Sequence, residues 1–190
     1  MNSFEQLPRQ SNESQESHEE PVEYLYHRVP DNLVGDTLYP LNELRETHPD
    51  VYELAKSKYE GREEITEKTI PIGDSTWNDA LQFTTVHPHK IKEALLAAGA
   101  QLSSTEWYQI PVSLLKPDHA VIGFYSGDSM ENFKPVSEES LKESATLPET
   151  TKQYYREQLA NGERPFLFHG IPHIFYKGSI LLKDCTKITV

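Results

Sequence analysis

The chain has 190 residues, and its 18 Lys and Arg residues against 30 Asp and Glu residues give a formal net charge of −12 at pH 7. This balance does not favour nucleic acid as a partner, because a polyanion binds through a basic surface. No run reaches the ~18 consecutive apolar residues of a membrane span, and the first residues lack the basic start and apolar run of a signal peptide. We therefore expect a soluble, cytoplasmic protein without membrane contact, with export as an effector as the alternative.

Residues 1–20 differ in composition from the rest of the chain. They hold Glu5, Glu13, Glu16, Glu19 and Glu20 amid Ser, Asn and Gln, with few sizeable apolar groups. Such a segment cannot bury enough apolar surface to offset the entropy lost on ordering. The sequence therefore predicts a disordered acidic and polar tail at 1–20 and a single folded domain at 21–190.

The folded part begins with a strand followed by two helices. The segment 22–29 is dense in β-branched and aromatic residues and predicts a strand, which Pro30 and the polar residues after it close as a turn. The segment 40–61 predicts a helix broken in two. Pro49 disfavours the α conformation at His48, and proline suits the first turn of a new helix.

Short apolar runs and two periodic stretches predict the remaining elements. The predicted strands are 69–72, 80–86, 107–115 and 120–126, with apolar runs at 165–168 and 171–182. The predicted helices are 88–98 and 151–160. The segment 127–150 is rich in Ser, Glu, Lys and Pro and predicts a mobile loop carrying a short helix near 138–144. Interspersed strands and helices favour an α+β fold.

Several well-known signatures are absent from the sequence. It contains no GxxxxGK[ST], no GxGxxG after a strand, no HExxH and no GxSxG. This excludes the P-loop, Rossmann, zincin and α/β-hydrolase classes in their recognisable forms. The single cysteine, Cys185, excludes an intramolecular disulfide framework and a Cys-rich zinc module.

Four histidines near predicted strand ends suggest a metal-dependent enzyme as one hypothesis. They are His87, His89, His169 and His173. Neutral imidazoles can converge on a divalent ion, with a carboxylate such as Asp79 or Asp118 completing the shell. The two local spacings, HxH and HxxxH, are weak signals, and Pro88 starts a helix that disturbs the first of them. Hydrogen-bonded structural histidines are the alternative.

A second set of residues follows the order of a known family. Its members, in chain order, are Tyr26, His27, Asn32, Arg62 and Glu163, the last followed by Pro165-Phe-Leu-Phe and the turn Ile171-Pro172. This order resembles ADP-ribosyltransferases, and within them the DNA-modifying DarT branch. The middle motif of that branch is replaced here by His87-Pro88-His89. The chain from about residue 23 to 180 is also similar to an uncharacterised bacterial family of group-specific proteins.

The resemblance to ADP-ribosyltransferases implies a fold and a set of roles. The implied fold has two small, twisted, mainly antiparallel sheets with peripheral helices. The implied activity transfers ADP-ribose from NAD, the substrate, to an unknown acceptor, with Glu163 as the catalytic carboxylate. Tyr26, His27 and Asn32 are then expected to hold the dinucleotide, and Arg62 to contact its phosphates.

Physical chemistry supports these residue types. Cleavage of the bond between nicotinamide and ribose passes through an oxocarbenium-like state, which a carboxylate stabilises. Histidine can bind a ribose hydroxyl, arginine can bind pyrophosphate, and aromatic residues such as Tyr125 and Trp77 can stack on a base. The alternative function is a non-catalytic binding or regulatory module that uses an aromatic pocket near Tyr26 and Trp77.

Overall fold

A computed structural model describes residues 21–61, 63–126 and 129–190. The predicted tail at 1–20, Arg62 and residues 127–128 lie outside the described residues. Within them the chain is a mixture of helices and small antiparallel sheets, which confirms the mixed α and β character predicted from the sequence. None of the helices in these ranges is long and apolar enough to cross a membrane.

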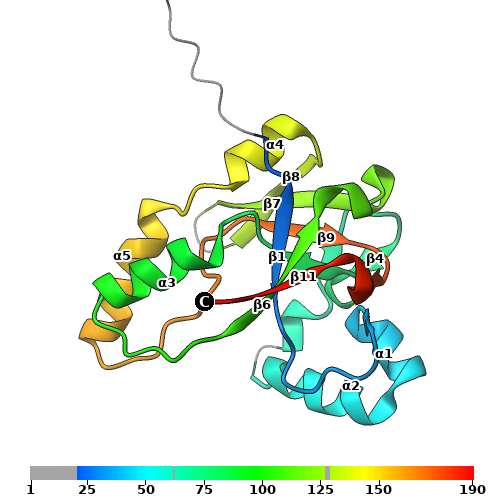
Figure 1. Cartoon of the computed structure of the whole chain (residues 1–190), viewed down its shortest axis with the longest axis horizontal. Coiled ribbons are helices and arrows are strands. Elements are labelled where there is room, and N and C mark those ends of the chain that lie inside the picture. The colour runs from blue at the N-terminus through cyan, green and yellow to red at the C-terminus, as the bar shows by residue number, and fades with distance from the viewer. Residues whose placement is uncertain (1–20, 62, 127–128) are drawn as a thin grey trace, which may run out of the picture.

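Helices and strands are interspersed along the chain (Figure 1). The helices are α1 Leu41–Thr47, α2 Pro49–Lys56, α3 Pro88–Ala97, α4 Glu138–Ser144 and α5 Glu149–Ala160. The strands are β1 Tyr24–Arg28, β2 Thr37–Leu38, β3 Thr69–Ile70, β4 Ser75–Thr76, β5 Leu81–Phe83, β6 Glu106–Pro111, β7 Ala120–Ser126, β8 Ser129–Pro135, β9 His173–Tyr176, β10 Ile180–Leu181 and β11 Thr186–Thr189. Short 3₁₀ segments include η1 Ser57–Tyr59 and η3 Trp77–Asp79.

Two larger antiparallel sheets carry the fold. One has the strand order β1-β6-β11, and the other has the order β5-β9-β7-β8. Two-stranded pairs, β10 with β2 and β3 with β4, complete the described sheets. In Figure 1, α3 and α5 lie side by side at one end of the strands, and α1 and α2 lie at the opposite end.

An isolated bridge joins the two sheets at β1 and β5. Tyr26 and Thr84 exchange both backbone hydrogen bonds, of 2.8 and 3.1 Å. In a continued antiparallel ladder, the next such pair would be Arg28 with Gln82. The strands separate instead, and the Nδ1 atom of His27 lies 2.9 Å from the Gln82 carbonyl oxygen. The side chain of His27 thus satisfies a carbonyl that the ladder leaves unpaired.

The main apolar core fills the space between the two sheets. Its fully buried members come from five strands and are Leu25, Phe83, Ile110, Ile122 and Ile174. A second cluster packs α3 against α5, with Ile91 and Leu95 facing Tyr155 and Ile171. Burial of these side chains stabilises the short strands, which carry few hydrogen bonds of their own.

Proline places the break between the first two helices as the sequence predicts. Helix α1 ends at Thr47, His48 takes a non-helical conformation with φ −143° and ψ 71°, and Pro49 starts α2. The predicted helix at 138–144 is confirmed with those bounds, and the predicted helices 88–98 and 151–160 are confirmed with one end shifted by one and two residues. Helix α4 begins at a reciprocal serine cap, Ser137 with Ser140.

Two predictions for loops and strands are wrong. The segment predicted as a loop at 127–150 carries the predicted helix as α4, but it also contains strand β8 and the start of α5. Strand β8 was not predicted because its mostly exposed side chains show no apolar alternation. It is an edge strand, which pairs with β7 among the described strands. The apolar run 165–168 forms no strand and leads into the turn 167–170. Its apolar residues Leu167 and Phe168 pack against other core side chains instead.

Helix α5 holds the turn 167–170 by side chains that bind its backbone. The buried Thr151 hydroxyl donates to the His169 carbonyl at 3.0 Å, and the Tyr155 hydroxyl donates to the Leu167 carbonyl at 2.5 Å. Gly170 follows with φ +71°, and a Cβ atom there would lie 2.8 Å from the Thr151 hydroxyl oxygen. The turn therefore needs glycine both for its backbone conformation and for its close approach to α5.

We predict that Gly170→Ala destabilises the protein more than Gly162→Ala. Both glycines have positive φ, +71° and +74°, but a Cβ at Gly162 would meet no atom within 4 Å. Gly162→Ala should cost about 1 kcal/mol of backbone strain, whereas Gly170→Ala should cost roughly 1 to 3 kcal/mol more because Thr151 must shift. Urea denaturation of both variants measures the difference. Equal costs would show that the contact with Thr151 does not constrain the turn.

Candidate functional site

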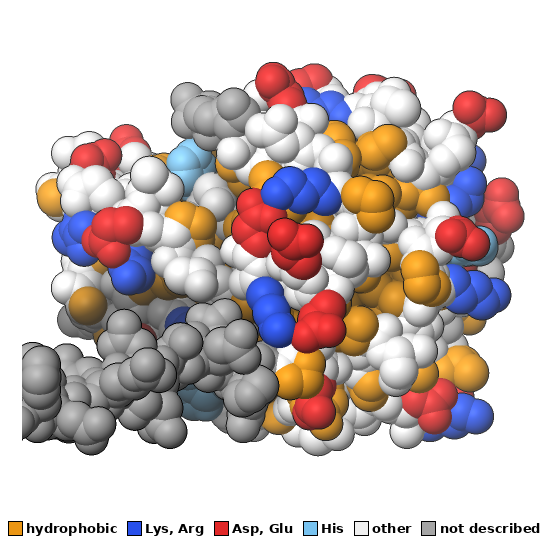
Figure 2. Space-filling view, turned by 90° about the horizontal axis from the view of Figure 1, so that it is seen from above, with side chains coloured by type: hydrophobic (Ala, Val, Ile, Leu, Met, Phe, Trp, Pro, Cys, Tyr) orange, Lys and Arg blue, Asp and Glu red, His pale blue; other side chains and the backbone are white. Residues whose placement is uncertain are grey.

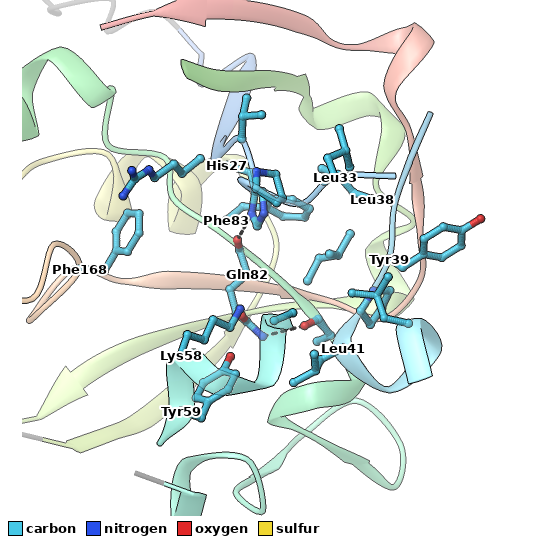
Figure 3. Close-up of a pocket in the computed structure, with 18 of the residues that line it drawn as sticks. His27, Leu33, Leu38, Tyr39, Leu41, Lys58, Tyr59, Gln82, Phe83 and Phe168 are labelled. Atoms are coloured by element: carbon cyan, nitrogen blue, oxygen red, sulfur yellow. Dashed lines mark hydrogen bonds between the residues drawn. The ribbon is translucent and has the colours of Figure 1, made fainter. Parts of the chain in front are cut away.

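A pocket of about 780 Å³ opens where β1 and β5 separate. Its walls come from the 26–41 segment, from helices α1 and α2, from β5, and from the segment 166–169. Figure 3 shows Leu33, Leu38 and Leu41 on one side of it, with Lys58, Tyr59 and Phe168 elsewhere around the cavity. This volume lies within the ~300 to 1,000 Å³ typical of small-molecule sites.

Three of the predicted site residues line this pocket. They are Tyr26, His27 and Asn32, and the aromatic candidates Trp77 and Tyr125 line it as well. The structure thus brings together residues from β1, from η3 and from β7 that are far apart in sequence. The predicted phosphate contact Arg62 lies outside the described residues.

The predicted catalytic residue Glu163 lies elsewhere. It is exposed, follows the end of α5, and its backbone N–H donates to the Gln158 carbonyl at 2.8 Å. Glu163 is not among the described residues that line the pocket; the carboxylate found there is that of Asp31. Three residues after Glu163, however, the chain reaches the pocket wall at Phe166.

The four histidines of the metal hypothesis are divided between two places. His169 and His173 line the pocket, whereas His87 stacks on His89 at a centroid distance of 5.3 Å and contacts Tyr26. Within the described ranges, no three His, Cys, Asp or Glu side chains are grouped closely enough to hold a metal ion. Asp79 instead accepts hydrogen bonds from Asn42 and Thr76.

His27 is neutral at physiological pH and has a defined tautomer. Burial lowers its pKa to about 4; the hydrogen bond to Gln82 opposes this shift, and the positive charge of Lys58 adds to it. Because the Gln82 carbonyl can only accept, Nδ1 of His27 carries the proton and Nε2 is left as an acceptor (Figure 3). Phe83 contacts the ring edge to face, at 5.8 Å between centroids.

His173 shows the same chemistry at the start of β9. Its Nδ1 atom lies 2.7 Å from the Ile171 carbonyl oxygen, so Nδ1 carries the proton and Nε2 can accept. Burial lowers the pKa of His173 to about 4, against the opposing effect of this hydrogen bond. The pocket therefore contains two uncharged imidazoles, each with an acceptor nitrogen.

The two imidazoles project from opposite faces of the joined strands. Phe83 pairs with Ile174, and Tyr26 pairs with Thr84. Paired residues share a face and neighbours along a strand point to opposite faces. His27 therefore lies on the face of Phe83, and His173 lies on the opposite face. Both still line one pocket because the strands separate beyond the bridge. A ligand that contacts both Nε2 atoms must present a hydrogen-bond donor to each of them.

Aromatic side chains surround His173. The centroids of Trp77, Tyr125 and Phe168 lie 5.9, 6.2 and 5.8 Å from the centroid of the imidazole. His169 stacks on Tyr154 of α5 at 3.8 Å, which fixes the adjoining wall. Such a group of rings suits a planar ligand, because stacked and edge-to-face contacts add to the burial of apolar surface.

Charged and apolar groups occupy the edge of the pocket. Arg28 and Lys58 line it and are exposed, with Asp31 nearby in the lining. Exposed apolar side chains of Val34, Leu54 and Phe166 also contribute. On the face of the molecule in Figure 2, acidic and basic side chains are interspersed among apolar ones, with no field of one sign.

Sequence reasoning missed Lys58 and Phe168 as pocket residues, and it assigned His173 only to a metal. Lys58 lies in the short segment η1, where a charged residue resembles ordinary surface. His173 carried a usable signal, because it follows Pro172 at the start of an apolar run, where a strand-end histidine can face a cavity. Its tautomer depends on the backbone of Ile171 and was not predictable.

No protein-family model, no curated protein and no solved structure matches this chain. The pocket and its chemistry are therefore the basis for assigning a function.

We predict that stability falls as the pH drops from about 6.5 toward 4. His27 and His173 have folded-state pKa values of about 4, below the ordinary value of 6.5, so the unfolded chain binds more protons in this window. Each histidine should cost on the order of 1 to 2 kcal/mol of stability when the pH is lowered from 7.5 to 5. Urea denaturation between pH 7.5 and 5 measures this loss.

The control for this experiment compares two histidine variants. His173→Asn removes one titrating group and should flatten the pH profile, whereas His119→Asn, at an exposed position outside the pocket, should leave it unchanged. A His173→Asn profile as steep as that of the wild type would contradict the assignment of a neutral buried imidazole.

Proposed function

We propose that this pocket binds NAD and that the protein is an ADP-ribosyltransferase-like enzyme acting on an unidentified acceptor. The observation that carries the proposal is the pairing of an aromatic group around His173 with a separate acceptor at His27, inside one pocket of about 780 Å³. A dinucleotide has that form, with flat rings at its two ends and ribose hydroxyls between them. The two antiparallel sheets joined at Tyr26 and Thr84 are compatible with the fold that the family resemblance implies.

Each part of the dinucleotide finds suitable chemistry in the pocket. The Nε2 atom of His27 can accept a hydrogen bond from a ribose hydroxyl. Arg28 and Lys58 provide positive charge for the pyrophosphate, a role that the sequence assigned to Arg62. The rings around His173 can contact nicotinamide or adenine. NAD in a pocket of a protein with net charge −12 needs such local cations, because the overall field repels an anion.

In the proposed reaction, the bond between the nicotinamide nitrogen and the ribose carbon breaks, and nicotinamide leaves with the bonding electrons as a neutral molecule. A nucleophile of the acceptor forms the new bond to that carbon and loses its proton. A carboxylate near the ribose stabilises the developing positive charge. In this proposal Glu163, three residues before Phe166 of the pocket wall, takes that role, and Asp31 in the lining is the alternative carboxylate.

A non-catalytic NAD-binding module is the second candidate function. The observation that favours it is the position of Glu163, which is exposed and outside the pocket lining. The two candidates share the binding step and differ only in cleavage.

We predict that NAD binds to the wild-type protein and that His27→Ala weakens this binding at least ~tenfold, since one hydrogen bond to a sugar hydroxyl and the fit around it are lost. Calorimetric titration in buffer with a chelator measures the affinity. His27→Asn keeps a donor for the Gln82 carbonyl and controls for damage to β1. His119→Ala is the surface control. If millimolar NAD gave neither a heat of binding nor thermal stabilisation, the proposal would be wrong.

We predict further that the two carboxylate variants separate the two candidate functions. With bound NAD, the wild type should release nicotinamide, and the variant of the catalytic carboxylate, Glu163→Gln or Asp31→Asn, should lose at least ~100-fold in rate while keeping its affinity for NAD. Chromatography of released nicotinamide measures the rate. Tight NAD binding without any release, even with cell extract as a source of acceptor, would favour the binding module.

A further inference from the structure

His173 lies at the centre of a ring of aromatic side chains from three different elements. Trp77 comes from η3, Tyr125 from β7 and Phe168 from the turn that α5 holds. Their planes are inclined to the imidazole by 49°, 56° and 70°. All four residues line the pocket. We call this group the aromatic box. Phe175 also stacks on the imidazole, at 6.0 Å between centroids, so a planar ligand would contact the box from its pocket side.

The box contains an acceptor whose hydrogen-bonding role is fixed by the tautomer of His173. The Ile171 carbonyl takes the proton of Nδ1, so Nε2 of His173 can accept a hydrogen bond and cannot donate one. A ligand atom facing Nε2 must therefore be a donor. A carboxylate in that place would face the lone pair of the nitrogen and would lose its own hydration without compensation.

The box also contains an unpaired donor. The Nε1–H group of Trp77 is buried and has no hydrogen-bond partner among the residues that the structure describes. A buried donor left unpaired costs free energy, but this nitrogen is closed off from the pocket space and is not offered to a ligand there. The polar atom of the box with a fixed role is therefore Nε2 of His173, which requires a donor such as the NH₂ group of a primary carboxamide.

We propose that the aromatic box recognises the carboxamide of a nicotinamide ring, with His173 as the residue that determines specificity for the amide over the acid. The amide NH₂ donates to Nε2 of His173, and Trp77 and Tyr125 contact the ring of the ligand. This inference rests on the proposed binding of NAD and assigns the end of the pocket at which nicotinamide lies. His27, on the opposite face of the strands, then contacts the part of the dinucleotide distant from this ring.

The test compares NAD with nicotinic acid adenine dinucleotide, which differs only in carrying a carboxylate in place of the amide. Calorimetric titration of the wild type should show at least ~tenfold tighter binding of NAD, because a site built for a donor rejects an analogue that lacks it. His173→Ala should reduce this preference to within about threefold, mainly by weakening the binding of NAD. Free nicotinamide and free nicotinate serve as second probes of the box alone.

Two variants control the experiment. His173→Asn keeps a side-chain amide donor for the Ile171 carbonyl and so separates loss of the fold from loss of the acceptor. His119→Ala changes a histidine outside the pocket and should keep the full preference of the wild type. Circular dichroism of each variant reports whether the fold is retained.

A spectroscopic readout makes the test independent of any variant. In ¹⁵N-labelled wild type, addition of nicotinamide should shift the Nε2 resonance of His173, while its Nδ1 resonance remains that of a protonated nitrogen. A protonated Nε2 in the free protein, or a resonance unmoved by saturating ligand, would overturn the inference.

The outcomes also separate this inference from the proposed function. If NAD binds but the preference is absent, or persists in His173→Ala, the box assignment is wrong and NAD binding stands. If NAD fails to bind while free nicotinamide binds in a manner that needs His173, the proposed function is wrong and the box assignment stands. If neither binds, both are overturned.

Discussion

The pocket depends on a single point at which two sheets meet and then separate. Tyr26 and Thr84 hold β1 and β5 together by two hydrogen bonds. The next pair expected in such a ladder, Arg28 with Gln82, does not form. A separated strand leaves a polar carbonyl that must find a partner. His27 supplies that partner from its own side chain, so one residue both ends the ladder and presents an acceptor to the cavity that opens there. Its structural role and its proposed binding role use different nitrogens.

The opposite wall is fixed by a different device. The turn 167–170 has no ladder of its own, and side chains of α5 bind its carbonyls through Thr151 and Tyr155. Both residues are fully buried, so these hydrogen bonds are sheltered from water. Stacking of Tyr154 on His169 adds a third contact. The wall that carries Phe168 is thus positioned by a helix, which is more rigid than an unsupported loop.

The sequence predicted those features that depend on local chemistry. Pro49 divides α1 from α2, and periodic apolar residues define α3, because backbone sterics and burial act over a few neighbours. The grouping of Tyr26, His27 and Asn32 was also predictable, since they are close in sequence. The hydrogen bond from His27 to Gln82 spans 55 positions and was not. Glu163 was assigned as the catalytic carboxylate from motif order alone. Motif order does not determine the direction in which the side chain of a residue after α5 points.

Electrostatics divides the site into an uncharged interior and a charged edge. Burial keeps His27 and His173 neutral, so the inner surface offers hydrogen-bond acceptors and rings without formal charge. Arg28, Lys58 and Asp31, by contrast, are exposed lining residues. A ligand that satisfies both zones must place neutral or weakly polar rings inside and ionised groups toward solvent. Salt screens exposed charges much more than buried dipoles. Contacts with the exposed charges therefore set the association rate of such a ligand, and contacts with the buried polar groups set its specificity.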